Sequence, residues 1–166
     1  NGIDTKKFHK IDLLYKEKMK NNTEYQNKKV FLWCSSDKPK KGLKLILDVW
    51  KRVSANNKDI HLIVIGNKKE YIGDGVTFLG KIPNDQLPKY YQMADCYLFP
   101  TLCHEGFGLS LIEALNCGCY CIASKLGGVP EVLQDGKYGK LIENPNFTSE
   151  WETAINDYIY ANDKPI

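Results

Sequence analysis

Short apolar runs alternate with amphipathic segments along most of this chain. The runs are nearly continuous in apolar residues, as strands buried on both faces of a sheet are, and they occupy residues 30–34, 60–65, 76–79, 96–99 and 119–123. After the first run, apolar side chains recur at helical spacing and predict an amphipathic helix through Leu43, Ile46, Leu47, Trp50 and Val53. A strand followed by a helix is the unit from which parallel sheets are built.

Further helices continue this alternation. Asn84 is a suitable N-cap for a helix that follows it, because its side chain can accept a hydrogen bond from the first turn. Residues 109–116 predict a helix that is apolar nearly all round and therefore central in the fold. Ser149 and Glu152 have the spacing of a capping box at the start of a last helix.

Five or six short strands separated by helices predict an α/β protein with a doubly wound, Rossmann-like parallel sheet. Residues 140–142 would form its edge strand. In this architecture, ligands bind outside the carboxyl ends of the strands. Loops rich in glycine or lysine follow predicted strands at residues 35–42, 101–108 and 124–128, and we expect them to converge at that edge.

Length and charge narrow the possible classes of protein. A chain of 166 residues fits one domain with a real core, and a net charge of +3 with a pI near 8.4 is too mild for a nucleic-acid partner. No apolar run reaches the roughly 18 residues of a membrane span. The lysines gather locally, at Lys38, Lys40, Lys41 and Lys44. They form either a solvated basic loop or a loop in which one lysine faces a phosphate.

Six cysteines raise the question of metal sites or disulfides. Three of them alternate in the sequence Cys117-Gly118-Cys119-Tyr120-Cys121. Alternate residues of a strand lie about 6.5–7 Å apart, too far for neighbours to share one tetrahedral zinc ion. A Cys-x-x-Cys pair with nearby histidines is also missing from the sequence. We therefore expect no metal, and reduced cysteines that pack as small apolar residues in a reducing compartment.

The segment from Glu105 to Glu113 carries the clearest chemistry. Two carboxylates enclose Gly106-Phe107-Gly108-Leu109 and the start of the predicted helix. Glycines allow backbone N–H groups to approach a ligand closely, and a helix N-terminus favours an anion. Carboxylates accept hydrogen bonds from sugar or ribose hydroxyls. This combination predicts a pocket for a nucleotide sugar, and the lack of a Gly-x-Gly-x-x-Gly fingerprint after the first strand weighs against NAD or FAD.

With these motifs in place, nearly the whole chain resembles the C-terminal, donor-binding domain of family 4 retaining glycosyltransferases (glycosyl transferases group 1), which have the two-domain GT-B fold. The resemblance rests on the Glu105–Glu113 segment together with the motifs Lys41-Gly42-Leu43, Phe78-Leu79-Gly80, Met93-Ala94-Asp95 with Pro100, Gly127-Gly128-Val129-Pro130-Glu131 and Asp135-Gly136. It places Met93 to Asp95 and Pro100 at the approach to the donor site. It also implies that residues 1–8 are an interdomain linker and residues 9–166 the donor domain.

The resemblance implies a role for each site residue. Glu105 and Lys41 would be catalytic: Glu105 would bind hydroxyls of the donor sugar, and Lys41 would neutralise the leaving diphosphate. Backbone N–H groups of Gly106, Phe107, Gly108 and Leu109 would meet the sugar and the diphosphate. Glu113 would bind the ribose, and Gly80 would lie near the nucleobase.

One family feature is missing. An arginine that usually pairs with the diphosphate is replaced by Ser36. Lys38 or Lys40 would supply the second cation, or the hydroxyls of Ser35 and Ser36 would contact phosphate, or the site is weaker than usual. His104, also unusual before the first glutamate, either lines the pocket or packs elsewhere.

We therefore interpret the chain as the donor half of an enzyme that transfers a sugar from a nucleoside diphosphate sugar with retention of anomeric configuration. The nucleotide is left open among UDP, GDP and ADP, and no cofactor is expected. The rival interpretations are a non-catalytic nucleotide-binding module of the same fold and a sugar-nucleotide epimerase.

The partners and the location follow from this interpretation. The acceptor domain would be an N-terminal domain that is absent from this chain, so the isolated chain would bind nucleotide with little turnover. A glycan or lipid-linked acceptor, used in bacterial polysaccharide assembly, is expected. The full-length protein would then be cytoplasmic and peripheral at the inner face of the membrane.

Overall fold

The computed structural model describes residues 4–36, 38–67, 72–73, 75–103 and 108–161. Their strands form one sheet in the order β3-β4-β2-β1-β5-β6-β7. The strands are β1 (Lys29–Cys34), β2 (Ile60–Ile65), β3 (Ile72–Gly73), β4 (Val76–Gly80), β5 (Cys96–Phe99), β6 (Tyr120–Ser124) and β7 (Gly139–Ile142). All neighbouring pairs are parallel except the short β3 against β4. The predicted doubly wound sheet is confirmed, and β7 is its edge strand in the described part of the chain.

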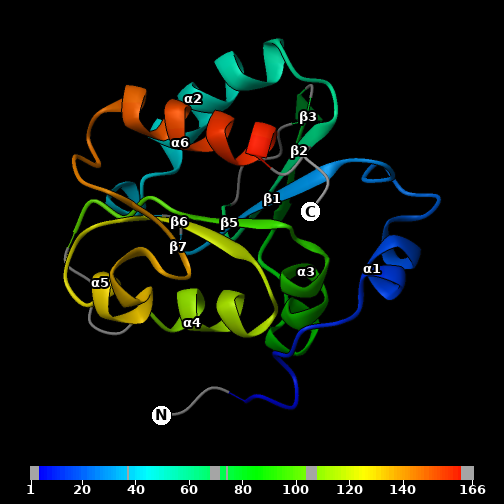
Figure 1. Cartoon of the computed structure of the whole chain (residues 1–166). Helices are drawn as coiled ribbons and strands as arrows, with labels where there is room; N and C mark the ends of the chain where they lie inside the picture. The colour runs from blue at the N-terminus through cyan, green and yellow to red at the C-terminus, as the bar shows by residue number, and fades with distance from the viewer. Residues whose placement is uncertain (1–3, 37, 68–71, 74, 104–107, 162–166) are drawn as a thin grey trace.

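Helices cover both faces of this sheet (Figure 1). Figure 1 shows α2 (Leu43–Ala55) and α6 (Thr148–Ala161) on one face, and α3 (Leu87–Met93), α4 (Leu109–Asn116) and α5 (Val129–Val132) on the other. Three single turns of 3₁₀ helix lie at Pro39–Lys41, Asn84–Gln86 and Gln134–Gly136. A separate buried apolar cluster fills each side of the sheet.

All three tryptophans lie in the core. Trp33, Trp50 and Trp151 are each no more than 1% exposed, in the cluster beneath α2 and α6. Four of the six cysteines are buried, and the described cysteines form no disulfide. Burial raises the pKa of the Cys34 thiol to about 11 and that of Cys117 to about 12, which keeps both thiols protonated. The reducing compartment stays a prediction.

The helix α1 (Leu13–Lys20) was not predicted from the sequence. Its residues Leu13, Leu14 and Tyr15 are exposed, whereas Lys20 is buried. Apolar residues that point outward give no amphipathic pattern from which a helix could be predicted. Just before it, Phe8 is buried with its ring centroid 5.6 Å from that of Tyr91, so this part of the predicted linker packs against α3.

Two predicted helix caps are wrong. Asn84 begins a 3₁₀ turn whose cap position is Pro83, and α3 starts only at Leu87. Ser149 is the second residue of α6, so it lies inside the helix and not at its N-cap. Glu152 bonds the guanidinium of Arg52 at 2.6 Å instead of the helix start. A long-range ion pair has replaced the local capping contact.

Candidate functional site

The sheet has its topological switch point between β1 and β5. From β1 the strand order runs outward through β2 and β4, and from β5 it runs the other way through β6 and β7. The ladder between the two central strands pairs only Phe31 with Cys96 and Leu32 with Tyr97. It ends before the carboxyl ends of both strands. Doubly wound sheets bind ligands outside this point, so a ligand site is expected beside the residues that follow β1 and β5.

The lysine loop, residues 35–41, follows β1 and packs against the chain that leaves β5. The backbone N–H of Leu102 donates to the carbonyl of Lys40 at 2.7 Å. Gly42 has φ +79°, and a Cβ there would lie 1.9 Å from the carbonyl oxygen of Pro100, so only glycine fits. The indole N–H of Trp33 donates to the carbonyl of Lys41 at 3.2 Å. Two of the three predicted loops are therefore in direct contact.

Gly80 lies at the same edge of the sheet. The N–H of Gly66 donates to the Gly80 carbonyl at 2.8 Å, and the N–H of Ser35 donates to the Ile65 carbonyl at 3.2 Å. A Cβ on Gly66 would lie 1.8 Å from the carbonyl oxygen of Ser35. The exposed Ser36 follows directly. The predicted donor residues Ser36 and Gly80 thus belong to neighbouring loops.

The start of α4 lies where the sequence predicts an anion site. Gly108 is its N-cap residue with φ 57°, and a Cβ there would lie 3.7 Å from the Phe99 ring at the end of β5. The N–H groups of Leu111 and Ile112 donate to the Gly108 carbonyl, which begins the helix. The first N–H groups of a helix lack partners within it, and they carry the positive end of its dipole. This end of α4 lies at the carboxyl edge of the sheet, beside the end of β5.

Glu113, one turn further along α4, is half-buried. Burial raises the pKa of its carboxyl, and within the described residues this carboxylate has no hydrogen bond or ion pair. Its negative charge also raises the pKa values of Cys34 and Tyr91, after the larger effect of their own burial, which places it near the end of β1. A partly buried carboxylate without a protein partner is costly and is typical of a group that meets a ligand.

Three predicted site residues, Glu105, Gly106 and Phe107, lie outside the described residues, as does His104. Their assigned roles stay predictions. The third loop does follow β6 at the same edge, where Ser124 ends the strand. The hydroxyl of Ser124 is fully buried and has no hydrogen-bond partner in the described part of the chain. Sequence reasoning did not single out this residue, because a serine before a glycine turn is common.

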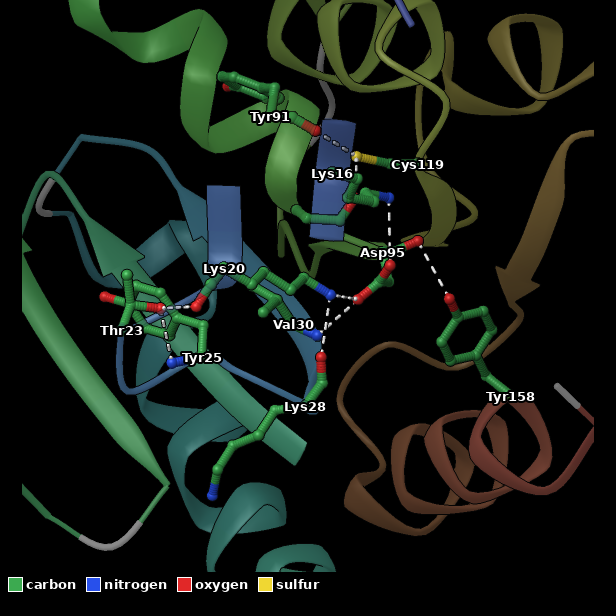
Figure 2. Close-up of polar contacts among 11 residues, drawn as sticks. Lys16, Lys20, Thr23, Tyr25, Lys28, Val30, Tyr91, Asp95, Cys119 and Tyr158 are labelled. Carbon is green, nitrogen blue, oxygen red and sulfur yellow. Dashed lines mark hydrogen bonds and ion pairs between the residues drawn. The ribbon is translucent and has the colours of Figure 1, made fainter. Parts of the chain in front are cut away.

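One predicted placement is wrong. Asp95 directly precedes β5, so Met93 to Asp95 lie at the amino edge of the sheet, opposite the donor edge. Figure 2 shows the Asp95 carboxylate between the ammonium groups of Lys16 at 3.1 Å and Lys20 at 2.8 Å. The N–H of Val30 donates to the same carboxylate at 2.8 Å. Burial alone would raise the pKa of Asp95, but the two lysines hold it below its ordinary value. Asp95 anchors α1 to the sheet.

The described residues contain no group of three or more His, Cys, Asp or Glu side chains that could hold a metal ion. None of the helices they form has the length and apolar character needed to cross a bilayer.

Comparisons with known proteins agree with this geometry. The family model "Glycosyl transferases group 1" matches residues 15–164. N-acetyl-alpha-D-glucosaminyl L-malate synthase of Bacillus anthracis is 30% identical over 93% of this chain and 42% of its own length. The chain therefore spans less than half of that relative.

Solved structures share the fold. Anabaena Alr3699/HepE, in complex with UDP, superposes with a TM-score of 0.80 at 23% identity, over 98% of this chain and 47% of that one. The C-terminal domain of a group 1 glycosyl transferase, LpcC of Francisella tularensis, superposes with a TM-score of 0.77 at 21% identity, over 96% and 88% of the two chains. With its switch-point loops, a Glu113 that has no partner among the described residues, and a family match over 150 of its residues, the chain belongs to the group 1 glycosyl transferases and has the fold of the C-terminal domain of a GT-B enzyme.

Proposed function

We propose that this chain is the donor-binding domain of a glycosyltransferase that takes its sugar from a nucleoside diphosphate sugar. The observation that carries the proposal is the half-buried Glu113, which has no partner among the described residues. It stands one turn behind a helix N-terminus and close to the end of β1. A carboxylate acceptor, an anion seat and a lysine loop at one sheet edge match the ribose, the diphosphate and the charge of such a donor.

Each group of residues is proposed to bind one part of the donor. Glu113 accepts hydrogen bonds from the ribose hydroxyls, and N–H groups of residues 106–109 hold the diphosphate and the sugar. Lys41 neutralises the charge that grows on the leaving diphosphate. Glu105 binds the sugar hydroxyls and stabilises the developing positive charge at the anomeric carbon.

Retention is proposed to follow from attack on the face that the diphosphate leaves. The bond between the anomeric carbon and the phosphate oxygen breaks, the acceptor oxygen bonds the same face, and the acceptor proton passes to the departing phosphate. This step asks the protein only for positioning and charge stabilisation. It assigns no nucleophile to the chain.

The choice of nucleotide rests on weaker support. The superposed HepE structure holds UDP, which makes UDP the first nucleotide to test here. GDP and ADP are its rivals, because the sequence does not choose among the three nucleotides. Calorimetric titration of the chain with all three nucleoside diphosphates tests the choice, and failure of all three to bind would contradict the proposed function.

The acceptor site is proposed to lie in the part of the enzyme that this chain does not contain, since relatives are about twice as long. The acceptor would be a glycan or a lipid-linked glycan. We further expect the full-length protein to be a peripheral protein at the cytoplasmic face of the membrane. Fractionation of cells that express the full-length protein tests this location, and recovery wholly in the soluble fraction would contradict it.

The second candidate is a nucleotide-binding module without catalysis, which the serine at position 36 favours. Glu105→Gln in the full-length protein separates the two. If the protein is an enzyme, sugar transfer should fall by about a hundredfold or more while nucleotide affinity stays within about twofold. If the full-length wild type binds nucleotide but transfers no sugar to any tested acceptor, the module is correct.

A further inference from the structure

A buried histidine on β2 is hydrogen-bonded into a chain of three side chains. His61, the second residue of β2, is 6% exposed. Its Nε2 lies 2.7 Å from the hydroxyl of Thr77 on β4, and that hydroxyl donates to the carboxylate of Glu24 at 2.9 Å. An ionised carboxylate has no proton to give, so the Thr77 proton goes to Glu24 and His61 Nε2 donates to Thr77. A second proton on the ring would therefore be taken up at Nδ1.

The connection between α1 and β1, residues 21–28, covers this histidine. Tyr25 is buried, and its ring meets the His61 ring edge-on, with the centroids 5.1 Å apart. Glu24 ties the same connection to the sheet through Thr77. Hydration of a charged His61 ring therefore requires that this cover move away.

The connection has the features of a segment that opens as a unit. Asn22 and Asn27 both have left-handed backbone conformations, with φ 61°, which asparagine tolerates better than most residues, so they are suited to be hinges. Outside these hinges, the ammonium group of Lys20 donates to the Lys28 carbonyl at 2.9 Å (Figure 2), and that of Lys28 donates to the Lys58 carbonyl at 3.0 Å. The chain between the two asparagines is therefore able to move while α1 and β1 stay in place.

The charge state of His61 depends on whether this cover is closed. Burial lowers the pKa of the His61 imidazole, and this effect exceeds the opposite effect of Glu24, while the charge of Lys28 lowers the pKa further. Burial raises the pKa of Tyr25, which stays uncharged in acid. The closed form is thus fully favoured above the ordinary pKa of histidine. Its advantage is lost as the pH falls below that value toward the lower folded pKa.

We propose that residues 22–27 form a pH-sensitive clasp, which is closed over neutral His61 and opens when the ring takes up a second proton. The inference does not depend on the proposed function. His61 and Thr77 are each the second residue of their strands, so the clasp lies away from the carboxyl edge that holds the proposed donor site. It adds a conformational device to the part of the fold that joins α1 to the sheet.

Hydrogen exchange of backbone amides reports whether the clasp is closed. In the closed form the N–H of Asn22 donates to the Gln26 side chain at 3.0 Å, and the N–H of Tyr25 donates to the Thr23 hydroxyl at 3.1 Å (Figure 2). A turn this short does not keep such bonds without its contacts to the sheet, so opening exposes these amides to exchange. Amides of β2 stay bonded in both forms and serve as an internal reference.

The test compares the wild-type chain with three variants by hydrogen exchange at about pH 7.5 and about pH 5.5, with each rate divided by its intrinsic value at that pH. Wild-type protection of residues 22–27 should fall about fivefold to tenfold at the lower pH. His61→Gln keeps an N–H donor but does not titrate, so its protection should change less than about twofold. Thr77→Val should be weakly protected at both pH values. His9→Gln, the same substitution at an exposed position, should behave as the wild type does.

Three results would overturn the inference: protection of the wild-type clasp that is constant with pH, an equal loss in His61→Gln, or a parallel loss in β2, which would mark global unfolding. If His61→Gln does not fold, NMR titration of the His61 ring in the wild type decides the matter. A pKa below the ordinary value of histidine supports the clasp, and one at or above that value overturns it. Nucleotide binding plays no part in these measurements, so they cannot be confused with a failure of the proposed function.

Discussion

At the scale of single residues, the proposed site depends on Glu113, a carboxyl group whose burial opposes its ionisation. Glu113 is ionisable, half-buried and without a partner in the described structure, so burial raises its pKa. Such a group lowers the stability of the empty protein when it is ionised. This cost is acceptable if a ligand hydroxyl later meets the carboxylate.

Glu113→Gln should therefore stabilise the empty chain at neutral pH, by about 1–3 °C in Tm. The pKa of Glu113 is higher in the folded state than in the unfolded state, so the ionised wild type is penalised above the folded pKa. As pH falls through that pKa and the carboxyl becomes protonated, the gain from glutamine should shrink to nothing. Thermal melts across a pH series check this. A gain that is constant with pH, or a loss at neutral pH, would contradict the account.

At the scale of elements, burial determines what the sequence could reveal. The central strands, α2 and α4 were predicted correctly, because the positions of their apolar residues in the sequence match the positions that are buried in the structure. α1 was missed because its apolar residues face outward and its one buried residue is Lys20. Two-residue β3 is too short for any period. The two misses have different causes, since α1 is held by the contact of Lys16 and Lys20 with the distant Asp95, whereas β3 pairs with the neighbouring β4.

The sequence also predicted the site only in part. Glycine and lysine signals identified the loops around Ser36 and Gly108, and the family resemblance added Gly80. The described residues of these loops do lie at one edge. Met93 to Asp95 were placed at the wrong edge, because a motif's order along the chain does not say which end of a strand it adjoins.

The anchor of α1 gives a prediction at this scale. Asp95→Ala would leave Lys16 and the nearly buried Lys20 without their carboxylate and should destabilise the chain by about 3 kcal/mol. The pKa of Asp95 is lowered on folding, so its contribution is present above the unfolded pKa and is lost as pH falls through the lower folded value. Urea melts at neutral and strongly acidic pH should show the difference disappear in acid.

Lys125→Ala is the control for this anchor. Its pair with Glu143 is well exposed, with side chains 43% and 67% accessible, so removal should cost no more than about 0.5 kcal/mol. Equal losses from Asp95→Ala and Lys125→Ala would mean that the Asp95 cluster is no special anchor.

At the scale of the whole molecule, the two edges of the sheet have separate duties. The amino edge holds the Asp95 cluster and fastens α1, while the carboxyl edge brings together the loops after β1, β4, β5 and β6. Structural ties and the proposed ligand groups thus lie at opposite ends of the same strands. A substitution at the amino edge should change stability without changing nucleotide affinity.

The most direct test of the central claim is calorimetric titration of UDP, GDP and ADP into the wild-type chain and Glu113→Ala, with Glu143→Ala as a control from the exposed surface. We predict that at least one nucleotide binds the wild type, and that Glu113→Ala weakens it by about 1–3 kcal/mol through loss of charged hydrogen bonds to ribose. Glu143→Ala should bind as the wild type does. Unchanged affinity in Glu113→Ala, or no binding of any nucleotide to the wild type, would contradict the account.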